Sequence, residues 1–278
     1  SRVPDYRFPE RAASAMSVLA DRSEALATPI EQAPALKRIR PEAARRALEH
    51  GTRGEDGFLD AASAAQVALA YSIPVPEEIL AHHAAQAAAA ARKLGYPVAL
   101  KIASPDIPHK SDVGGVALDV KDESGVRQAF ERMVAQARAA RPQAKINGVT
   151  VQPMLPPGQE VIVGVVRDEQ FGPLVMFGSG GVEVEGLKDV AFALAPLTPR
   201  EADSLLDATW AGRRMRGFRN IPAGDRAAAL DAVVRLAQLT EDLPEISEIE
   251  VNPLRVLPGK GGAVAVDVRL KLREGKGT

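Results

Sequence analysis

The stretch SPDIPHKSDVGGV, residues 104–116, places several reactive side chains directly before two glycines. His109 supplies an imidazole and Ser111 a hydroxyl, and the other histidines of the chain lie in helix-like, Ala-rich surroundings. The backbone N–H groups of Gly114 and Gly115 could face a polyphosphate, although two glycines also suit a hairpin turn. A single histidine is most often an ordinary surface or core residue. The neighbouring residues therefore have to decide its role.

Lys101 lies within PVALKIA, residues 97–103, an apolar run that predicts a short strand. Its ammonium group should emerge at the surface of the sheet, where a lysine can contact a phosphate as a point charge. A lysine that simply faces solvent is an equally good interpretation.

A second polar cluster carries acidic side chains. Glu183, Glu185 and Asp189 follow the glycines of FGSGG. Beside a phosphate site this acidic patch would suit Mg²⁺ or a protonated histidine, whereas alone it indicates a solvated loop.

The third polar cluster lies near the C-terminus. Glu250, Asn252 and Asp267 are hard oxygen donors near the ends of two predicted strands that could lie side by side. Mg²⁺ prefers a few protein oxygens together with substrate phosphates, and this set has that character. A turn-capping role for Asn252 before a proline is the simpler alternative.

Composition excludes several classes of protein. The 278 residues carry a formal net charge of −1, which argues against an electrostatic nucleic-acid binder. Cysteine is absent, so the chain has no disulfide framework, thiolate metal site or cysteine nucleophile. No apolar run approaches the ~20 residues of a membrane helix, and the N-terminus lacks an apolar signal core. We therefore expect a cytoplasmic protein whose partners include neither nucleic acid nor membrane.

Hydrophobic periodicity predicts helices and strands that alternate along the chain. The expected helices cover residues 8–28, 58–70, 77–96, 124–142, 198–209 and 223–243. The expected strands cover residues 97–103, 116–122, 148–155, 159–168, 173–181, 245–258 and 261–272. Interspersed helices and mixed strands favour an α+β architecture in two lobes over a regular series of parallel strands.

Together these segments resemble the ATP-grasp domain of the NDP-forming acyl-CoA synthetases, a β-subunit-like, C-terminal region in enzymes such as ADP-forming acetyl-CoA synthetase. The resemblance extends over roughly residues 57–270 in the family's order. It rests on YSIPVP, PVALKIASPDIPHKSDVGGV, VQPMLPPGQEVIVGVVRDEQFGPLVMFGSGGVEVEGLKDVAF, RGFRNIP, EIEVNPL and AVDVRL.

The resemblance implies an ATP-grasp fold, in which two α/β lobes clamp a nucleotide. Residues 1–28 look like the tail of a preceding CoA-ligase subdomain. The basic, Pro-interrupted pattern of residues 29–56 predicts a linker with a short helix. The ATP-grasp domain would occupy residues 57–278, with subdomains at about 70–145 and 146–278. The chain then resembles the C-terminal part of a longer protein.

Site roles follow from the same resemblance. Lys101, Ser111, Gly114 and Gly115 would surround the nucleotide phosphates. Asn252 and Asp267 would hold Mg²⁺, with Glu250 beside the phosphoryl path. The remaining implied contacts are Gln152, Pro153 and Met154 against adenine and Glu160 at the ribose.

His109 matches the histidine that carries phosphate in the ADP-forming enzymes. An imidazole nitrogen accepts a phosphoryl group well, and the product is labile enough to pass it on. Asp112 or the acidic patch at residues 183–189 could orient this imidazole, and the sequence does not choose between them.

The family reaction converts acyl-CoA, ADP and phosphate into acid, CoA and ATP, and it needs CoA-binding and CoA-ligase domains from the same chain or a partner subunit. This chain is expected to bind ATP or ADP with Mg²⁺ but to lack full activity alone. One alternative is a nucleotide- or acyl-CoA-sensing regulatory module fused to a GNAT-type protein acetyltransferase. Another is a carboxylate–amine ligase of the ATP-grasp type, which the HKSD turn disfavours.

The Arg-rich run 213–219 also matches a family segment, although a solvated loop or an interdomain contact explains it as well.

Overall fold

The structure is a computed structural model that describes residues 4–27, 33, 35–54, 56–107, 110–180 and 189–273. The chain divides into two compact units, residues 1–34 and 35–278. The described residues of the first unit form helix α1 (Pro9–Ala27), in the segment predicted to be helical. Several of its apolar side chains are exposed, among them Met16, Leu19 and Leu26.

The second unit begins with two helices, α2 (Pro41–His50) and α3 (Ala61–Ala70). The Asp60 carboxylate accepts a hydrogen bond from the Ser63 backbone N–H and caps α3. Part of the segment predicted as a linker is therefore built into the core, because α2 buries Ala44 and Leu48 there.

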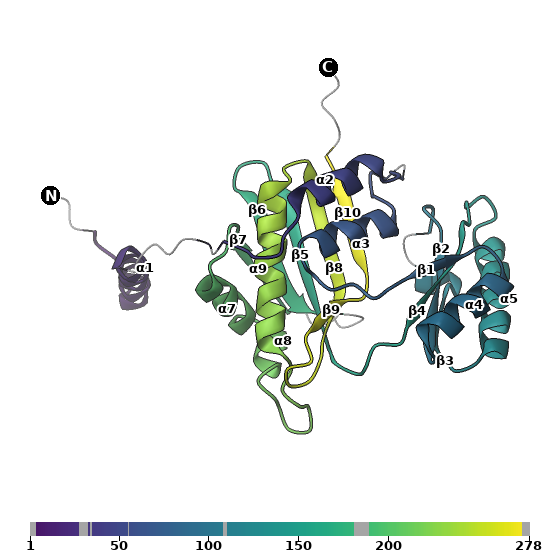
Figure 1. The fold of residues 1–278 in the computed structure, drawn as a ribbon. Coiled ribbons are helices and arrows are strands. Elements are labelled where there is room, and N and C mark those ends of the chain that lie inside the picture. The colour runs from purple at the N-terminus through teal and green to yellow at the C-terminus, as the bar shows by residue number, and fades with distance from the viewer. Residues whose placement is uncertain are drawn as a thin grey trace, which may run out of the picture. The chain divides into compact units, whose positions relative to one another are not determined.

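A four-stranded antiparallel sheet follows, in the order β1-β4-β2-β3. Its strands are β1 (Ile79–Ala81), β2 (Val98–Ala103), β3 (Val116–Val120) and β4 (Gly148–Pro153). The helices α4 (Ala84–Leu94) and α5 (Glu123–Ala140) pack on this sheet, as Figure 1 shows. A short 3-10 helix, η1 (Lys110–Val113), precedes β3.

One helix prediction was wrong at its start. Residues 77–96 were expected to form a single helix, but residues 79–81 form β1 and pair with Val149–Val151 of β4. The helix begins only after His83, whose side chain accepts a hydrogen bond from the Gln86 backbone N–H at 3.3 Å. Strand pairing therefore overrides the local helical pattern of this segment.

The second sheet has six antiparallel strands in the order β10-β8-β5-β6-β7, and β9 also pairs with β8. Its strands are β5 (Gln159–Asp168), β6 (Gly172–Ser179), β7 (Val190–Leu194), β8 (Ile246–Val256), β9 (Ala263–Ala265) and β10 (Val268–Leu272). Three helices lie between β7 and β8 in the chain: α7 (Pro199–Asp207), α8 (Trp210–Arg214) and α9 (Arg226–Asp242). The long helix α9 runs across one face of the sheet (Figure 1).

The burial pattern of β8 determines which side chains remain available for a site. Ile249, Val251 and Leu254 are buried in the core cluster that includes α9. Glu250 and Asn252 alternate with them and remain partly exposed on the opposite face. The prediction of an α+β fold is confirmed.

The chain enters and leaves the four-stranded sheet once each. It leaves the larger core after α3, builds β1 to β4 with α4 and α5, and returns at β5 through residues 154–158. The sequence-based boundary near residue 146 falls before β4, which belongs to the four-stranded sheet. Across the described ranges, no helix is both long and apolar enough to cross a membrane.

Candidate nucleotide and phosphoryl-transfer site

Asn252 and Asp267 lie directly opposite each other where β8 meets the start of β10. Val268 pairs with Val251, and the Asn252 N–H donates to the Asp267 carbonyl oxygen at 3.2 Å. Glu250 is paired with Arg269 in the same ladder. Antiparallel pairing therefore brings together the three oxygen donors predicted from separate segments.

This donor set fits Mg²⁺ only as a partial site. It offers two carboxylates and one amide, and Mg²⁺ takes a few protein oxygens and completes its shell with water and substrate phosphates. In the part of the chain that the structure describes, no group of three or more His, Cys, Asp or Glu residues could hold a metal by itself. The site suits a metal that arrives with a nucleotide.

Two lysines from the four-stranded lobe contact the segment that contains Asp267. The Lys101 ammonium donates to the Val266 carbonyl oxygen at 2.9 Å and lies 3.6 Å from a Glu78 carboxylate oxygen. The Lys110 ammonium lies 3.7 Å from Asp267 Oδ1. Three residues predicted from the sequence, Lys101, Asn252 and Asp267, therefore meet around the Val266–Asp267 segment.

The glycine turn differs from the prediction in one respect. The Gly114 N–H donates to the Ser111 carbonyl oxygen at 3.1 Å, and the Gly115 N–H donates to the Lys110 carbonyl oxygen at 2.8 Å. Gly114 has a positive φ of 65°, a backbone conformation that favours glycine. These two N–H groups close the turn, so we do not assign them to phosphate contact. The Ser111 side chain is exposed.

The predicted adenine segment lies at the connection between the two sheets. Gln152 ends β4 with Pro153, and its buried Oε1 has no hydrogen-bond partner. Leaving a buried acceptor unpaired costs about 1–3 kcal/mol, so a donor from a ligand would relieve it. The Met154 N–H is already used, because it donates to the Pro97 carbonyl oxygen at 3.0 Å.

Glu160, predicted at the ribose, forms an ion pair across the sheet. Its carboxylate accepts a hydrogen bond from Arg255 Nη2 at 2.5 Å, and both side chains are only partly exposed. Arg255 also donates to the Leu155 carbonyl oxygen at 3.4 Å, within the connection between the sheets. The arginine therefore fixes the carboxylate beside the predicted adenine segment.

The family model for the ATP-grasp domain matches residues 16–272 of this chain. The chain belongs to the ATP-grasp domain family. This result confirms the fold class predicted from the sequence motifs.

Relatives of known activity support a narrower comparison. The ADP-forming acetate–CoA ligase I of Archaeoglobus fulgidus is 39% identical over 285 residues, which cover 99% of this chain and 39% of that protein. The subunit beta of the ADP-forming acetate–CoA ligase I of Pyrococcus furiosus is 43% identical over 202 residues, which cover 73% of this chain and 86% of the subunit. The ATP-grasp chain thus spans about two fifths of the longer relative and most of the separate subunit.

A solved structure agrees with these comparisons. The dinucleotide forming acetyl-coenzyme A synthetase 1 of Ca. Korarchaeum cryptofilum, solved with coenzyme A, Ca-AMPCP and HgCl+, superposes with a TM-score of 0.77. It is 38% identical, and the match covers 84% of the ATP-grasp chain and 99% of the solved chain. The resemblance to acyl-CoA synthetases is therefore confirmed in both sequence and structure.

His109, Glu183 and Glu185 lie outside the described residues. Asp112 is exposed in η1.

Asp189, from the same predicted acidic patch, accepts hydrogen bonds from within the fold. Its carboxylate accepts hydrogen bonds from the backbone N–H groups of Trp210 and Ala211 at 2.7 and 2.8 Å, and from the Ser179 hydroxyl at 2.8 Å. Burial by itself would raise the pKa of Asp189, but these donors outweigh it and lower the pKa below its ordinary value. Asp189 ties β6 to the start of α8.

The Arg-rich run also makes structural contacts. The Arg216 guanidinium forms an ion pair with Asp207 at 2.6 Å, and Arg213 donates to the Asp207 carbonyl oxygen at 3.0 Å. The rings of Trp210 and Phe218 meet edge to face, with centroids 5.0 Å apart. These contacts fold the run against α7 and α8.

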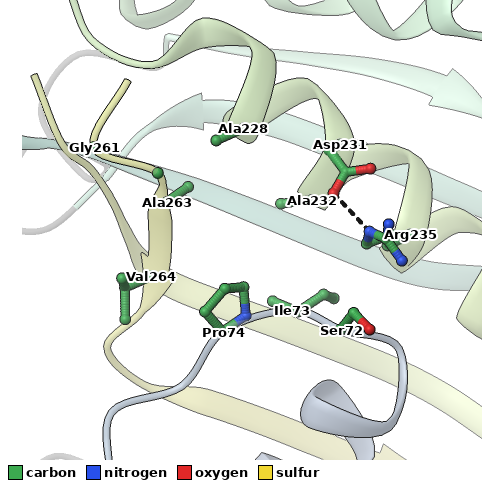
Figure 2. Close-up of a pocket in the computed structure, with 11 residues that line it drawn as sticks. Ser72, Ile73, Pro74, Ala228, Asp231, Ala232, Arg235, Gly261, Ala263 and Val264 are labelled. Carbon is green, nitrogen blue, oxygen red and sulfur yellow. Dashed lines mark hydrogen bonds and ion pairs between the residues drawn. The ribbon is translucent and has the colours of Figure 1, made fainter. Parts of the chain in front are cut away.

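A separate cavity of about 300 Å³ lies between α9, the Ser72–Pro74 segment and residues 261–264 (Figure 2). Its Arg235 guanidinium is paired with Asp231 at 2.6 Å and also donates to the carbonyl oxygens of Lys37 and Tyr71. None of the predicted site residues lines this cavity. Because its charged groups already have partners, we do not place the nucleotide there.

The sequence analysis missed the roles of Lys110 and Arg255. Lys110 stands next to His109 in the stretch that attracted attention first, so its position was the available signal. Arg255 follows Asn252 by three residues, and its pairing with Glu160 depends on the β5–β8 register. No local pattern predicts that register.

Proposed function

We propose that this chain is the nucleotide-binding, phosphoryl-transferring part of an ADP-forming acyl-CoA synthetase. The observation that carries the proposal is the contact of Lys101 with the Val266–Asp267 segment, directly opposite Asn252. A cation and oxygen donors gathered in this way suit a metal-bound polyphosphate. The similarity to ADP-forming acetate–CoA ligases supports the same conclusion.

The chain's own residues would hold the nucleotide at both ends. Lys101 would exchange its Val266 contact for the nucleotide phosphates, since an ammonium group binds a phosphate more strongly than a neutral carbonyl oxygen. The adenine ring would lie against Gln152, Pro153 and Met154. The unpaired Gln152 Oε1 could accept a hydrogen bond from the amino group of adenine. Glu160, held by Arg255, would accept from the ribose hydroxyls.

Asn252 and Asp267 would hold Mg²⁺, with Glu250 beside them. When bound, Mg²⁺ would neutralise the phosphate oxygens and so lower the charge barrier to transfer. Arg269 lies opposite Glu250 in the ladder, and its guanidinium stacks 4.5 Å from the centre of the Phe58 ring.

His109 would carry the phosphoryl group. A ring nitrogen of His109 would attack the γ-phosphorus of ATP, so that a P–N bond forms while the P–O bond to the leaving ADP breaks. The other ring nitrogen keeps its proton, and the reverse step returns the phosphoryl group to ADP. CoA-binding and CoA-ligase domains, in the same chain or in a partner subunit, would make an acyl phosphate from acyl-CoA and phosphate. They would exchange its phosphoryl group with His109.

The direct test is labelling of the purified chain with ATP that carries a radioactive γ-phosphate, in the presence of Mg²⁺. We expect label that is lost in acid and stable in base, as for a phosphoramidate. The label should disappear in His109→Ala. It should persist in His50→Ala, a matched histidine on α2 whose ring contacts the Arg46 carbonyl oxygen.

Nucleotide binding without label on His109 would contradict the phosphohistidine assignment. Equal label in wild type and His109→Ala would contradict it too, since another residue would then carry the phosphate. The relatives described above are ligases, so we do not develop the alternative of an acetyltransferase-linked sensor.

A further inference from the structure

Lys110 makes a contact that the proposed function does not require. Its ammonium group lies 3.7 Å from the Asp267 carboxylate, and its side chain is only 21% exposed. In the sequence, Lys110 follows His109 directly and begins η1. The contact therefore joins the residue beside the proposed phosphate carrier to a proposed metal ligand.

A second contact supports this junction. Lys101, whose side chain is 12% exposed, donates to the carbonyl oxygen of Val266, the residue before Asp267. Lys101 lies on β2, and β2 leads into the turn that contains Lys110. Without nucleotide, the strand before the turn and the turn itself are thus held to successive residues of one short segment.

Backbone hydrogen bonds close the described part of the turn, residues 110–115, around Lys110. Its carbonyl oxygen accepts from the Gly115 N–H, and the Ile102 N–H donates to the Gly115 carbonyl oxygen at 2.8 Å. A Cβ atom on Gly115 would lie 2.7 Å from the Lys110 carbonyl oxygen, so the backbone is closely packed there. A shift of the Lys110 side chain should therefore be transmitted to the backbone of the turn.

We propose that Lys110 is a positioning residue: through Asp267 it holds residues 110–115, which follow His109 in the sequence, at the proposed phosphoryl-transfer site. The contact uses Oδ1 of Asp267, so the other carboxylate oxygen stays available to a metal. The proposal rests on the proposed function for its effect on transfer, but the contact itself can be tested without nucleotide.

The first test is hydrogen exchange of residues 110–115 in the metal-free protein with a chelator. In Lys110→Met we expect these amides to exchange up to about fivefold faster, the range that a single partly exposed ion pair supports. Asp267→Asn should produce the same change, and the double variant should add nothing further. Lys121→Met, which removes an exposed lysine paired with Asp119, should leave the turn unchanged.

The second test is the rate of His109 labelling at saturating ATP and Mg²⁺. Lys110→Met should label about tenfold more slowly or worse, because a misplaced nucleophile loses effective concentration, while the nucleotide dissociation constant changes less than about twofold. Lys110→Arg should restore most of the rate.

Unchanged exchange in both Lys110→Met and Asp267→Asn would overturn the proposal. A labelling defect that more nucleotide corrects would overturn it as well, because Lys110 would then be a nucleotide ligand. Absence of label in the wild-type protein would instead refute the proposed function, and the exchange experiment would still decide whether Lys110 holds the turn.

Discussion

Replacement of Asp189 by asparagine should destabilise the protein at neutral pH and much less in acid. The asparagine side chain would keep one acceptor oxygen for the Ala211 N–H or the Ser179 hydroxyl, but its amide group would face the Trp210 N–H. A hydrogen bond to a charged group contributes about 1.5–3 kcal/mol, and the exposed Trp210 N–H can recover water. We therefore expect a loss of about 2 kcal/mol in the free energy of unfolding at pH 7.

The pH dependence follows from the direction of the pKa shift. The pKa of Asp189 is lower in the folded protein than its ordinary value of 3.8, so its contribution is fully present above that value. The contribution disappears as the pH falls through the lowered pKa of the folded state. The difference between wild type and Asp189→Asn should therefore shrink in acid.

Urea unfolding of both proteins at pH 7 and near pH 3 would test this reasoning. Asp21→Asn, which removes one carboxylate from the separate helix α1, provides the control for net charge. Equal midpoints at pH 7, or a gap that is as large in acid as at neutrality, would show that the three hydrogen bonds do not stabilise the fold.

Three further substitutions have expected outcomes. Gly115→Ala should cost about 1–3 kcal/mol in urea unfolding, because its Cβ would lie 2.6 Å from Ile102 Cγ2 and overpack the turn. Tyr71→Phe should cost about 1 kcal/mol, since the buried hydroxyl donates to Asp242 at 2.8 Å. Burial and Asp242 raise the pKa of Tyr71 far above its ordinary value, so alkaline titration by absorbance should find one tyrosine that ionises only on unfolding. Thr198→Ala should lower the thermal midpoint by removing the capping box of α7, at about 1 kcal/mol, whereas Thr198→Ser should retain it.

Much of the fold could be predicted because its longer elements have clear periodic patterns. The helix over residues 226–242 and the strand over residues 159–168 were both expected within a few residues. The short elements β7 and α8 were missed, since five residues carry too little periodicity. For β1, three residues of strand lie in a helix-like sequence, and only pairing with β4 reveals them.

The site was predictable to the extent that its motifs are local. Asn252 and Asp267 were expected on neighbouring strands, and antiparallel pairing places them opposite each other. The contact between Lys110 and Asp267 joins segments far apart in the sequence, and the local pattern of neither segment predicts it. Asp189 was expected in an acidic patch suited to Mg²⁺ or a protonated histidine, or in a solvated loop. Its partners Trp210 and Ala211 are identified only in three dimensions.

The order of the elements has a consequence for biosynthesis. All buried members of the smaller core lie between Ala81 and Val151, so this lobe can fold as soon as that stretch has left the ribosome. The larger core joins α2 and α3 to strands that begin at β5 and end at β10. Its first apolar side chains, such as Ala44 and Leu48, must wait for the last strand to be synthesised. During that interval the nascent chain exposes a helical pair without its sheet, which is the stage at which it would depend most on chaperones.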